Sequence, residues 1–236
     1  MQQSLDKQNV MYPTLLATSP TTLSANELAV LCTLLGGTIQ GLPYNKPFTV
    51  SAKTYAKVRG VPIATARKFL DRAIETLWDG YYIVRYPETG KVTKFRWIID
   101  ISKHDGRYDL HLHPELIPLV TEITKYVSVK LLSIGNFKHK MSYYLYFYIH
   151  GSRKNHRDNR GTLVLNEAEF RLRYNVVDTY KGFGELKGKL IKPAIDELLV
   201  KGLFKRLDLV RVRGSEHFSL VWESERFIRR KEKEKS

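Results

Sequence analysis

The sequence contains one cysteine, Cys32, among its 236 residues. A single thiol cannot form a disulfide within the chain, and it cannot supply the thiolates of a structural zinc site. We therefore predict a chain without these cross-links that works in a reducing compartment. Cys32 stands in a leucine-rich stretch, which favours a small core residue over a reactive nucleophile.

Long apolar runs are also missing. No apolar stretch approaches the roughly 18 residues of a membrane-spanning helix, and the first residues lack the basic-then-apolar order of a secretory signal. The phosphate-binding pattern Gly-x-x-x-x-Gly-Lys-Ser/Thr does not occur, so we predict no ATP hydrolysis by this chain. We predict no enzymatic activity, no cofactor and no metal.

Acidic residues are few compared with basic ones. The chain has 24 Asp and Glu against 39 Lys and Arg, which gives a formal net charge of +15 and a pI of about 9.8. Nucleic acid is the usual partner of such a chain, because each phosphate that Lys or Arg neutralises releases counterions. The alternative is a basic protein without a polyanionic partner.

Helix and strand signals recur in a fixed order along the chain. Ser24 and Glu27 have the spacing of a capping box and predict the start of a helix. Residues 48–50 follow as a short strand, and Ser51 then caps a helix that runs to about Arg59.

A second helix follows directly and begins at Pro62, a favoured residue of the first turn. Its predicted buried stripe consists of Ala66, Phe69, Leu70, Ala73, Ile74 and Leu77. The turn at residues 87–90 predicts a hairpin, and strand, helix, turn, helix, hairpin is the order of a winged helix. The remaining segments of this half are two hairpin strands, a further strand and a last helix, at residues 81–86, 93–101, 108–112 and 114–126.

The second half repeats this order. Residues 163–165 form its strand, and Asn166 caps the helix that follows. Gly60 makes the tight turn between the two helices of the first half, and Asn175 occupies the matching position in the second half. Residues 213–215 form the turn of a second hairpin. Because type, order and spacing all recur, we predict an α+β fold with two tandem winged-helix domains related by duplication.

We divide the chain into a flexible N-terminal arm, two winged-helix domains and a charged C-terminal tail, at residues 1–22, 23–130, 131–224 and 225–236. The second domain opens with the aromatic-rich residues 141–151, which we interpret as a buried helix. Aromatic clusters can also stack on single-stranded bases, but core packing is the more typical use.

Several stretches of the sequence carry a resemblance to a known family. They are residues 54–56 with the turn 60–61, 95–99 followed by 110–116, 142–146, and 190–198. In this order and spacing they resemble the Rep_3 superfamily, the iteron-binding replication initiators of bacterial plasmids, over roughly residues 23–224. One departure is Tyr144-Leu145-Tyr146, where the family usually has Arg-Leu-Tyr.

The resemblance implies a function. Such initiators bind directly repeated duplex sites, the iterons, at a plasmid origin, usually as monomers. They help to open the origin and recruit the host initiator ATPase and the replicative helicase in the bacterial cytoplasm. Many also form homodimers through the first domain and repress their own gene. The first domain would then add dimerisation and backbone contacts, and the second domain would read the sequence.

The family reads DNA with the helix that contains residues 190–198. By helical geometry its apolar stripe is Leu186, Leu190, Ala194, Ile195 and Leu198. Its opposite stripe is Glu185, Lys189, Lys192 and Asp196. Lys189 and Lys192 are predicted to contact bases or phosphates, and Glu185 a cytosine amino group. Lys181 and Lys187 flank them, and Pro193 predicts a kink.

Further cations are predicted to contact the DNA backbone. They are Arg67, Lys68 and Arg72 of the first domain, Lys91 and Lys94 of its hairpin, Arg211 and Arg213 of the second hairpin, and Arg153 and Arg157 of the linking loop. Hairpin cations of this kind position the protein on phosphates without reading sequence. The alternative for each residue is an ordinary solvated charge.

Two other functions remain open at this stage. His111 and His113 lie on one face of a strand upstream of Tyr126, as in rolling-circle tyrosine nickases that bind a metal. An ordinary half-buried strand would show the same alternation. The second alternative is a transcriptional repressor with tandem winged helices, which composition does not distinguish from an initiator.

Overall fold

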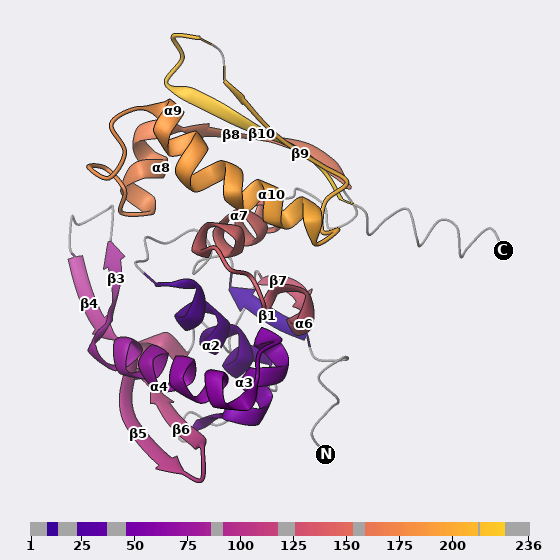
Figure 1. Cartoon of the computed structure of the whole chain (residues 1–236). Coiled ribbons are helices and arrows are strands. Elements are labelled where there is room, and N and C mark those ends of the chain that lie inside the picture. The colour runs from indigo at the N-terminus through magenta and orange to yellow at the C-terminus, as the bar shows by residue number, and fades with distance from the viewer. Residues whose placement is uncertain are drawn as a thin grey trace, which may run out of the picture. The chain divides into compact units, whose positions relative to one another are not determined.

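The computed structural model describes residues 9–13, 23–36, 46–85, 92–117, 126–152, 159–211 and 213–224. They divide into two compact units, residues 1–137 and 138–236. The first unit contains β1 (Asn9–Pro13), α2 (Ala25–Gly36), β2 (Phe48–Ser51), α3 (Ala52–Arg59), α4 (Ile63–Asp79), β3 (Tyr81–Arg85), β4 (Val92–Arg96), β5 (Ile98–His104), β6 (Arg107–Leu112), the 3-10 turn η2 (Pro114–Leu116), β7 (Tyr126–Lys130) and α6 (Leu131–Ile134) (Figure 1).

The second unit begins later than the sequence suggested. The predicted boundary separated residues 130 and 131, whereas the structure divides the chain after Phe137. The reason is α6, whose Leu131 and Ile134 are fully buried where α6 packs against α2 and α3 of the first unit.

Side-chain caps start the helices of the first unit as predicted. Ser24 Oγ donates to Glu27 Oε1 at 2.7 Å, and the Ser24 N–H donates to Glu27 Oε2 at 2.9 Å. The Thr54 N–H donates to Ser51 Oγ at 3.0 Å at the start of α3. Both capping predictions are confirmed.

Helix α4 buries one face against α2 and α3. Ala66, Leu70, Ala73, Ile74 and Leu77 are buried as predicted, with at most 2% of each exposed. The sixth predicted member, the phenylalanine at position 69, is instead 36% exposed. It lies at the edge of the helix face that the two neighbouring helices cover, so its inclusion in the buried stripe was wrong.

The hairpin predicted from residues 81–86 and 93–101 forms, because β3 and β4 pair antiparallel from Tyr81 with Arg96 to Arg85 with Val92, but it is separate from the three-stranded sheet of the first unit. Among the described strands, β3 and β4 pair with each other alone, while β2, β6 and β5 form a separate sheet in that order. The predicted strand 93–101 is broken at Trp97, which is 3% exposed and packs edge-on against Tyr82 at a ring distance of 5.2 Å. In the three-stranded sheet, β5 and β6 form the hairpin, and it turns at Asp105 and Gly106, both at positive φ.

The predicted flexible arm contains a strand. β1 (Asn9–Pro13) pairs antiparallel with β7 (Tyr126–Lys130). The sequence missed this pairing because its two strands lie far apart along the chain, and no local signal links them. Tyr126, the tyrosine of the nickase alternative and the predicted end of a helix from residue 114, instead begins β7. Of that predicted helix, the structure describes the single turn η2 and Ile117.

The second unit contains α7 (Lys140–Gly151), β8 (Arg160–Asn166), α8 (Glu167–Arg173), α9 (Phe183–Leu186), the π-helical turn η3 (Lys187–Ile191), α10 (Lys192–Val200), β9 (Arg206–Arg211) and β10 (His217–Glu223). Its sheet has the order β8-β10-β9. In Figure 1 the run α9–α10 crosses α7, and α10 packs against both α7 and β9.

Helix α7 forms the core of this unit. Tyr143, Tyr144, Tyr146 and Phe147 are at most 2% exposed, which confirms core packing as the role of the aromatic run. Its N-terminus is capped from α10: Glu197 accepts hydrogen bonds from the Lys138 and His139 N–H groups and from Ser142 Oγ, at 2.7, 3.2 and 2.6 Å.

The two units share one topology. In the three-stranded sheet of each unit, the strand that leads into α3 or α8 (β2 or β8) pairs with the last strand (β6 or β10), which also pairs with the strand before it (β5 or β9). Asn166 caps α8 by accepting from the Glu169 N–H at 3.1 Å. Gly60 and Asn175 both adopt left-handed backbone conformations, with φ of 64° and 52°. The predicted duplication of a winged helix is confirmed.

Candidate nucleic-acid interface

The predicted reading helix of the second unit is one continuous run, α9, η3 and α10, from Phe183 to Val200. We call it the recognition helix. It widens into a π-helical turn just before Pro193, where the Lys192 N–H donates to Lys187 O, five residues back. Pro193 therefore falls in the first turn of α10, where its missing N–H removes no hydrogen bond.

The π-helical turn changes which residues face the core. The predicted stripe contained Leu190, but Leu190 is only half-buried and Ile191 is fully buried. Leu186 and Ile191 are five residues apart because the wider turn inserts one residue between consecutive buried positions. The inclusion of Leu190 in the core stripe was wrong, whereas Ala194, Ile195 and Leu198 are buried as predicted.

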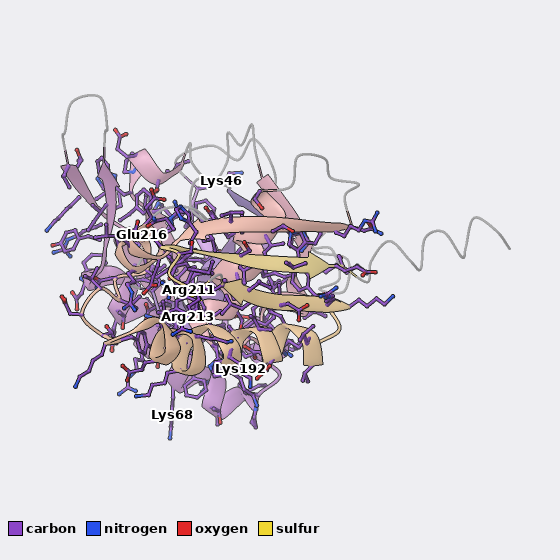
Figure 2. All side chains as sticks on the ribbon, turned by 90° about the horizontal axis from the view of Figure 1, so that it is seen from above. Lys46, Lys68, Lys192, Arg211, Arg213 and Glu216 are labelled. Carbon is purple, nitrogen blue, oxygen red and sulfur yellow. The ribbon has the colours of Figure 1, made fainter. Side chains whose placement is uncertain are left out.

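The exposed face of the recognition helix carries lysines at three predicted positions. Lys187, Lys189 and Lys192 are all exposed, and so is Lys181 just before the helix. Figure 2 labels Lys192 on this helix. Within the part of the chain that the structure describes, neither Lys187 nor Lys192 forms an ion pair. Their charges are thus available to a polyanion.

Glu185 and Lys189 form an ion pair with each other along the helix. Glu185 also accepts a hydrogen bond from the Lys181 N–H at 2.9 Å. The Lys189 ammonium, followed by this backbone N–H, holds the pKa of Glu185 below its usual value. The contacts predicted for Glu185 and Lys189 on DNA remain predictions, and each would first require this exposed pair to open.

The wing of the second unit is the β9–β10 hairpin. Arg213, at its turn, is exposed and forms no ion pair among the described residues. Arg211 has a different environment, because its Nη1 lies 2.8 Å from Glu167 Oε2 and its guanidinium carbon lies 4.1 Å from the centre of the Phe183 ring. Both arginines were predicted to contact phosphates. The structure leaves Arg213 free for this role and engages Arg211 within the unit.

Arg171 also pairs with Glu167, with its Nε 2.8 Å from Glu167 Oε1, and its Nη1 donates to Tyr180 O at 2.7 Å. Glu167, Arg171 and Arg211 thus form one cluster of charged side chains. Sequence reasoning missed Glu167 and Arg171. Their spacing of four residues on α8 predicts an ion pair, but the convergence of Arg211 from the wing has no sequence signal.

In the first unit, α4 occupies the position of the recognition helix. Arg67, Lys68 and Arg72 are exposed on it, and Lys68 extends outward in Figure 2. Asp71 lies 3.2 Å from Lys103 Nζ and accepts a hydrogen bond from the Tyr108 hydroxyl. The wing strands thus neutralise Asp71 and leave the three predicted cations without an acidic partner among the described residues.

A groove of about 420 Å³ lies between α4 and the β5–β6 turn, lined by residues that include Arg67, Asp71, Lys103 and Tyr108. By topology this turn corresponds to the one that carries Arg213. Lys94, predicted as a wing cation, is exposed on the separate β3–β4 hairpin. Lys91, Arg153 and Arg157 lie outside the described residues.

One histidine of the pair considered for a nickase, His113, makes a contact within the first unit. His113 Nδ1 accepts a hydrogen bond from the Glu115 N–H at 3.2 Å, and its ring lies 5.0 Å from that of Phe95. Across the described ranges, no three His, Cys, Asp or Glu side chains come together as a metal-binding group. The geometry of His113 is that of a cap for η2.

The sequence of this chain matches a known protein family. The family model described as initiator replication protein, WH1, matches residues 9–150, more than half of the chain. The chain belongs to this family. No curated protein sequence matches this initiator.

The fold of the initiator resembles that of a solved relative. The Pi initiator protein, in a crystal structure with iteron DNA, is 15% identical, with a TM-score of 0.75 over 92% of this chain and 98% of that one. The WH1 domain of the replication protein MSBI1.176, isolated from a multiple sclerosis patient, is 24% identical over 42% of this chain and 76% of that one, with a TM-score of 0.31. The first comparison confirms the α+β fold with winged-helix domains.

None of the helices within the described ranges is both long and apolar enough to cross a membrane.

Proposed function

We propose that this initiator binds directly repeated duplex sites at a plasmid origin, as a monomer, and reads them with the recognition helix of its second unit. The observation that carries the proposal is the exposed face of that helix. Lys187 and Lys192 are exposed there, without acidic partners among the described residues, while the nearby carboxylate of Glu185 is paired. A helix in the major groove contacts base edges mainly with its N-terminal half. Lys187 lies in that half, and Lys192 lies at the middle of the helix.

The second unit supplies two kinds of contact in this proposal. The recognition helix reads base edges in the major groove, and the wing, through Arg213, neutralises a phosphate. The net charge of +15 supports an electrostatic contribution to affinity. The iteron DNA bound by the Pi initiator, which shares this fold, supports the same class of site.

The first unit contacts the DNA backbone in this proposal, because Arg67, Lys68 and Arg72 are exposed on α4. We further propose that it mediates homodimerisation, through which the protein represses its own gene. Origin opening and recruitment of the host initiator ATPase and replicative helicase complete the activity. The protein would act in the bacterial cytoplasm, bound to plasmid DNA, without enzymatic activity of its own.

The test is binding of the purified chain to its own origin repeats and to a scrambled duplex, measured by fluorescence anisotropy across a salt series. Labelled single strands with magnesium or manganese are incubated in parallel. We expect a preference for the repeats of about a thousandfold or more at physiological salt, and no strand cleavage.

Three other outcomes would contradict the proposed function. Metal-dependent nicking with a covalent protein–DNA product would replace the proposal with a tyrosine nickase. Binding to an inverted repeat alone, with no affinity for direct repeats, would identify a repressor. Equal affinity for repeats and scrambled duplex would refute sequence-specific initiation.

A further inference from the structure

Glu167, the first residue of α8, lies between two arginines of the second unit. Its Oε1 lies 2.8 Å from Arg171 Nε, and its Oε2 lies 2.8 Å from Arg211 Nη1. The side chains of Glu167, Arg171 and Arg211 are only 17%, 11% and 28% exposed. Water and salt screen such pairs less than they screen pairs on an open surface. One carboxylate therefore pairs with both guanidinium groups at once, and the three side chains together keep one net positive charge.

Each arginine continues to an element of the proposed interface. Arg171 donates to Tyr180 O at 2.7 Å, in the turn that leads into the recognition helix. Arg211 donates through Nε and Nη2 to Ser215 O at 3.0 and 2.8 Å, in the wing. Its guanidinium also lies over the ring of Phe183, the first residue of the recognition helix. The cluster thus joins the start of that helix to the wing.

The backbone adds one more connection. The Glu167 N–H donates to Glu216 O in the wing at 2.8 Å. Glu216 stands directly before β10, and Figure 2 labels it with Arg211 and Arg213. A substitution of the Glu167 side chain leaves this backbone bond intact. The contribution of the carboxylate can therefore be tested separately from that of the backbone.

We propose that Glu167 is a positioning residue for DNA recognition. Its carboxylate sets the wing relative to the first turn of the recognition helix, and it keeps Arg171 and Arg211 from binding phosphates of any sequence. The inference rests on the proposed function. Specific binding requires the helix in the groove and the wing on the backbone at the same time. A released guanidinium, in contrast, binds any phosphate and favours every duplex alike.

A loss of this carboxylate should therefore act on specificity in a way that a general loss of stability would not. Affinity for the repeats should fall, while affinity for random duplex should hold or rise. A merely structural residue would weaken both, in parallel with the fraction of folded protein.

The experiment compares the full chain with its Glu167→Gln and Glu169→Gln variants. Glu169 lies on the same helix, is exposed and forms no ion pair among the described residues, so its variant matches the change in charge. Anisotropy is measured on repeat and scrambled duplexes across salt. For Glu167→Gln we expect the specificity ratio to fall about tenfold or more and the salt slope on scrambled duplex to steepen by about one. The Glu169→Gln variant should bind both duplexes more tightly than the wild type by the same factor.

A charge-preserving variant, Arg211→Lys, covers the case in which Glu167→Gln does not fold. Lysine lacks the planar fork that donates to Ser215 and stacks on Phe183. We expect its specificity ratio to fall at a temperature at which thermal unfolding shows the variant to be folded, and an unchanged ratio would overturn the inference. The inference would also be overturned if the specificity ratio of the Glu167→Gln variant lay within twofold of that of the Glu169→Gln variant. A wild-type chain with no preference for the repeats would instead overturn the proposed function and this inference together.

Discussion

Lys192 and Arg213 differ from neighbouring cations in what surrounds them. Lys189 pairs with Glu185 and Arg211 with Glu167, whereas Lys192 and Arg213 are exposed and form no ion pair among the described residues. A cation that already has a carboxylate partner releases fewer counterions when it meets a phosphate. Two residues of equal charge can therefore differ in what they contribute to DNA binding, and the environment of each gives different expectations for its substitution.

Substituting Lys192 should lower specificity. Because Lys192 lies on the exposed face of the recognition helix, we expect Lys192→Ala to weaken repeat binding by about 1–3 kcal/mol and scrambled binding by less. The measurement is anisotropy on both duplexes, with Lys205→Ala as a control, because Lys205 lies outside the recognition helix and pairs with Glu223. Equal losses on the two duplexes would remove Lys192 from base recognition.

Substituting Arg213 should lower affinity without changing specificity. Arg213 lies at the wing turn, where a cation contacts phosphate. We expect Arg213→Ala to weaken binding to both duplexes by the same factor. It should also reduce the slope of log affinity against log salt by about one. A salt titration on each duplex measures this slope, and an unchanged slope would contradict phosphate contact.

Glu197 should make stability depend on pH. Burial opposes its ionisation, but hydrogen bonds from Ser142, Lys138 and His139 outweigh burial, so the pKa of Glu197 is lowered. A lowered folded-state pKa contributes stability above the unfolded value of about 4.3, and this contribution is lost as pH falls through the folded value. We expect Glu197→Gln to cost about 1–2 kcal/mol near neutral pH. Urea unfolding from neutral to acidic pH should show this difference shrinking, and a constant difference would contradict the assignment.

At the scale of elements, the recognition helix shows how one inserted residue redirects a face. A regular period of 3.6 residues predicts Leu190 in the core, whereas the π-helical turn buries Ile191. The turn also places Pro193 where its missing N–H costs nothing. The sequence contained the proline that predicts an irregularity, but it did not show whether the helix would kink or widen.

Gly135, the C-cap of α6, and Gly188, inside the recognition helix, should respond oppositely to alanine. A Cβ at Gly135 would lie 2.1 Å from Val58 Cγ1, where α6 meets α3, so we expect Gly135→Ala to destabilise by about 1–3 kcal/mol. At Gly188 no atom lies within 4 Å of the added Cβ, so we expect Gly188→Ala to stabilise the free protein by about 0.5–1 kcal/mol. Thermal unfolding of both variants tests the pair, and a shift of the same sign in both would contradict this packing.

At the scale of the whole molecule, the two copies of the fold carry different charge patterns. The recognition helix of the second unit exposes lysines beside a paired glutamate. In the first unit, α4 exposes Arg67, Lys68 and Arg72, while the wing strands hold Asp71. Duplication of a fold does not duplicate its surface, and this difference supports the proposal that the second unit reads sequence and the first contacts the backbone.

This division predicts the effect of neutralising α4. We expect the triple change of Arg67, Lys68 and Arg72 to alanine to weaken repeat and scrambled binding by the same factor and to flatten the salt dependence on both. The specificity ratio should stay within about twofold of the wild-type value. A selective loss on the repeats would place sequence reading in the first unit as well.

The sequence by itself determined the elements whose signals are local. Capping pairs such as Ser24 with Glu27, helical periodicity and turn residues such as Gly60 and Asn175 act within a few positions, and their recurrence predicted the duplicated winged helix. Only the tertiary structure decided which strands pair and which charges remain free. The β1–β7 pair, the wing turn at Gly106 and the two arginines at Glu167 depend on residues far apart along the chain, whose encounter is set by packing.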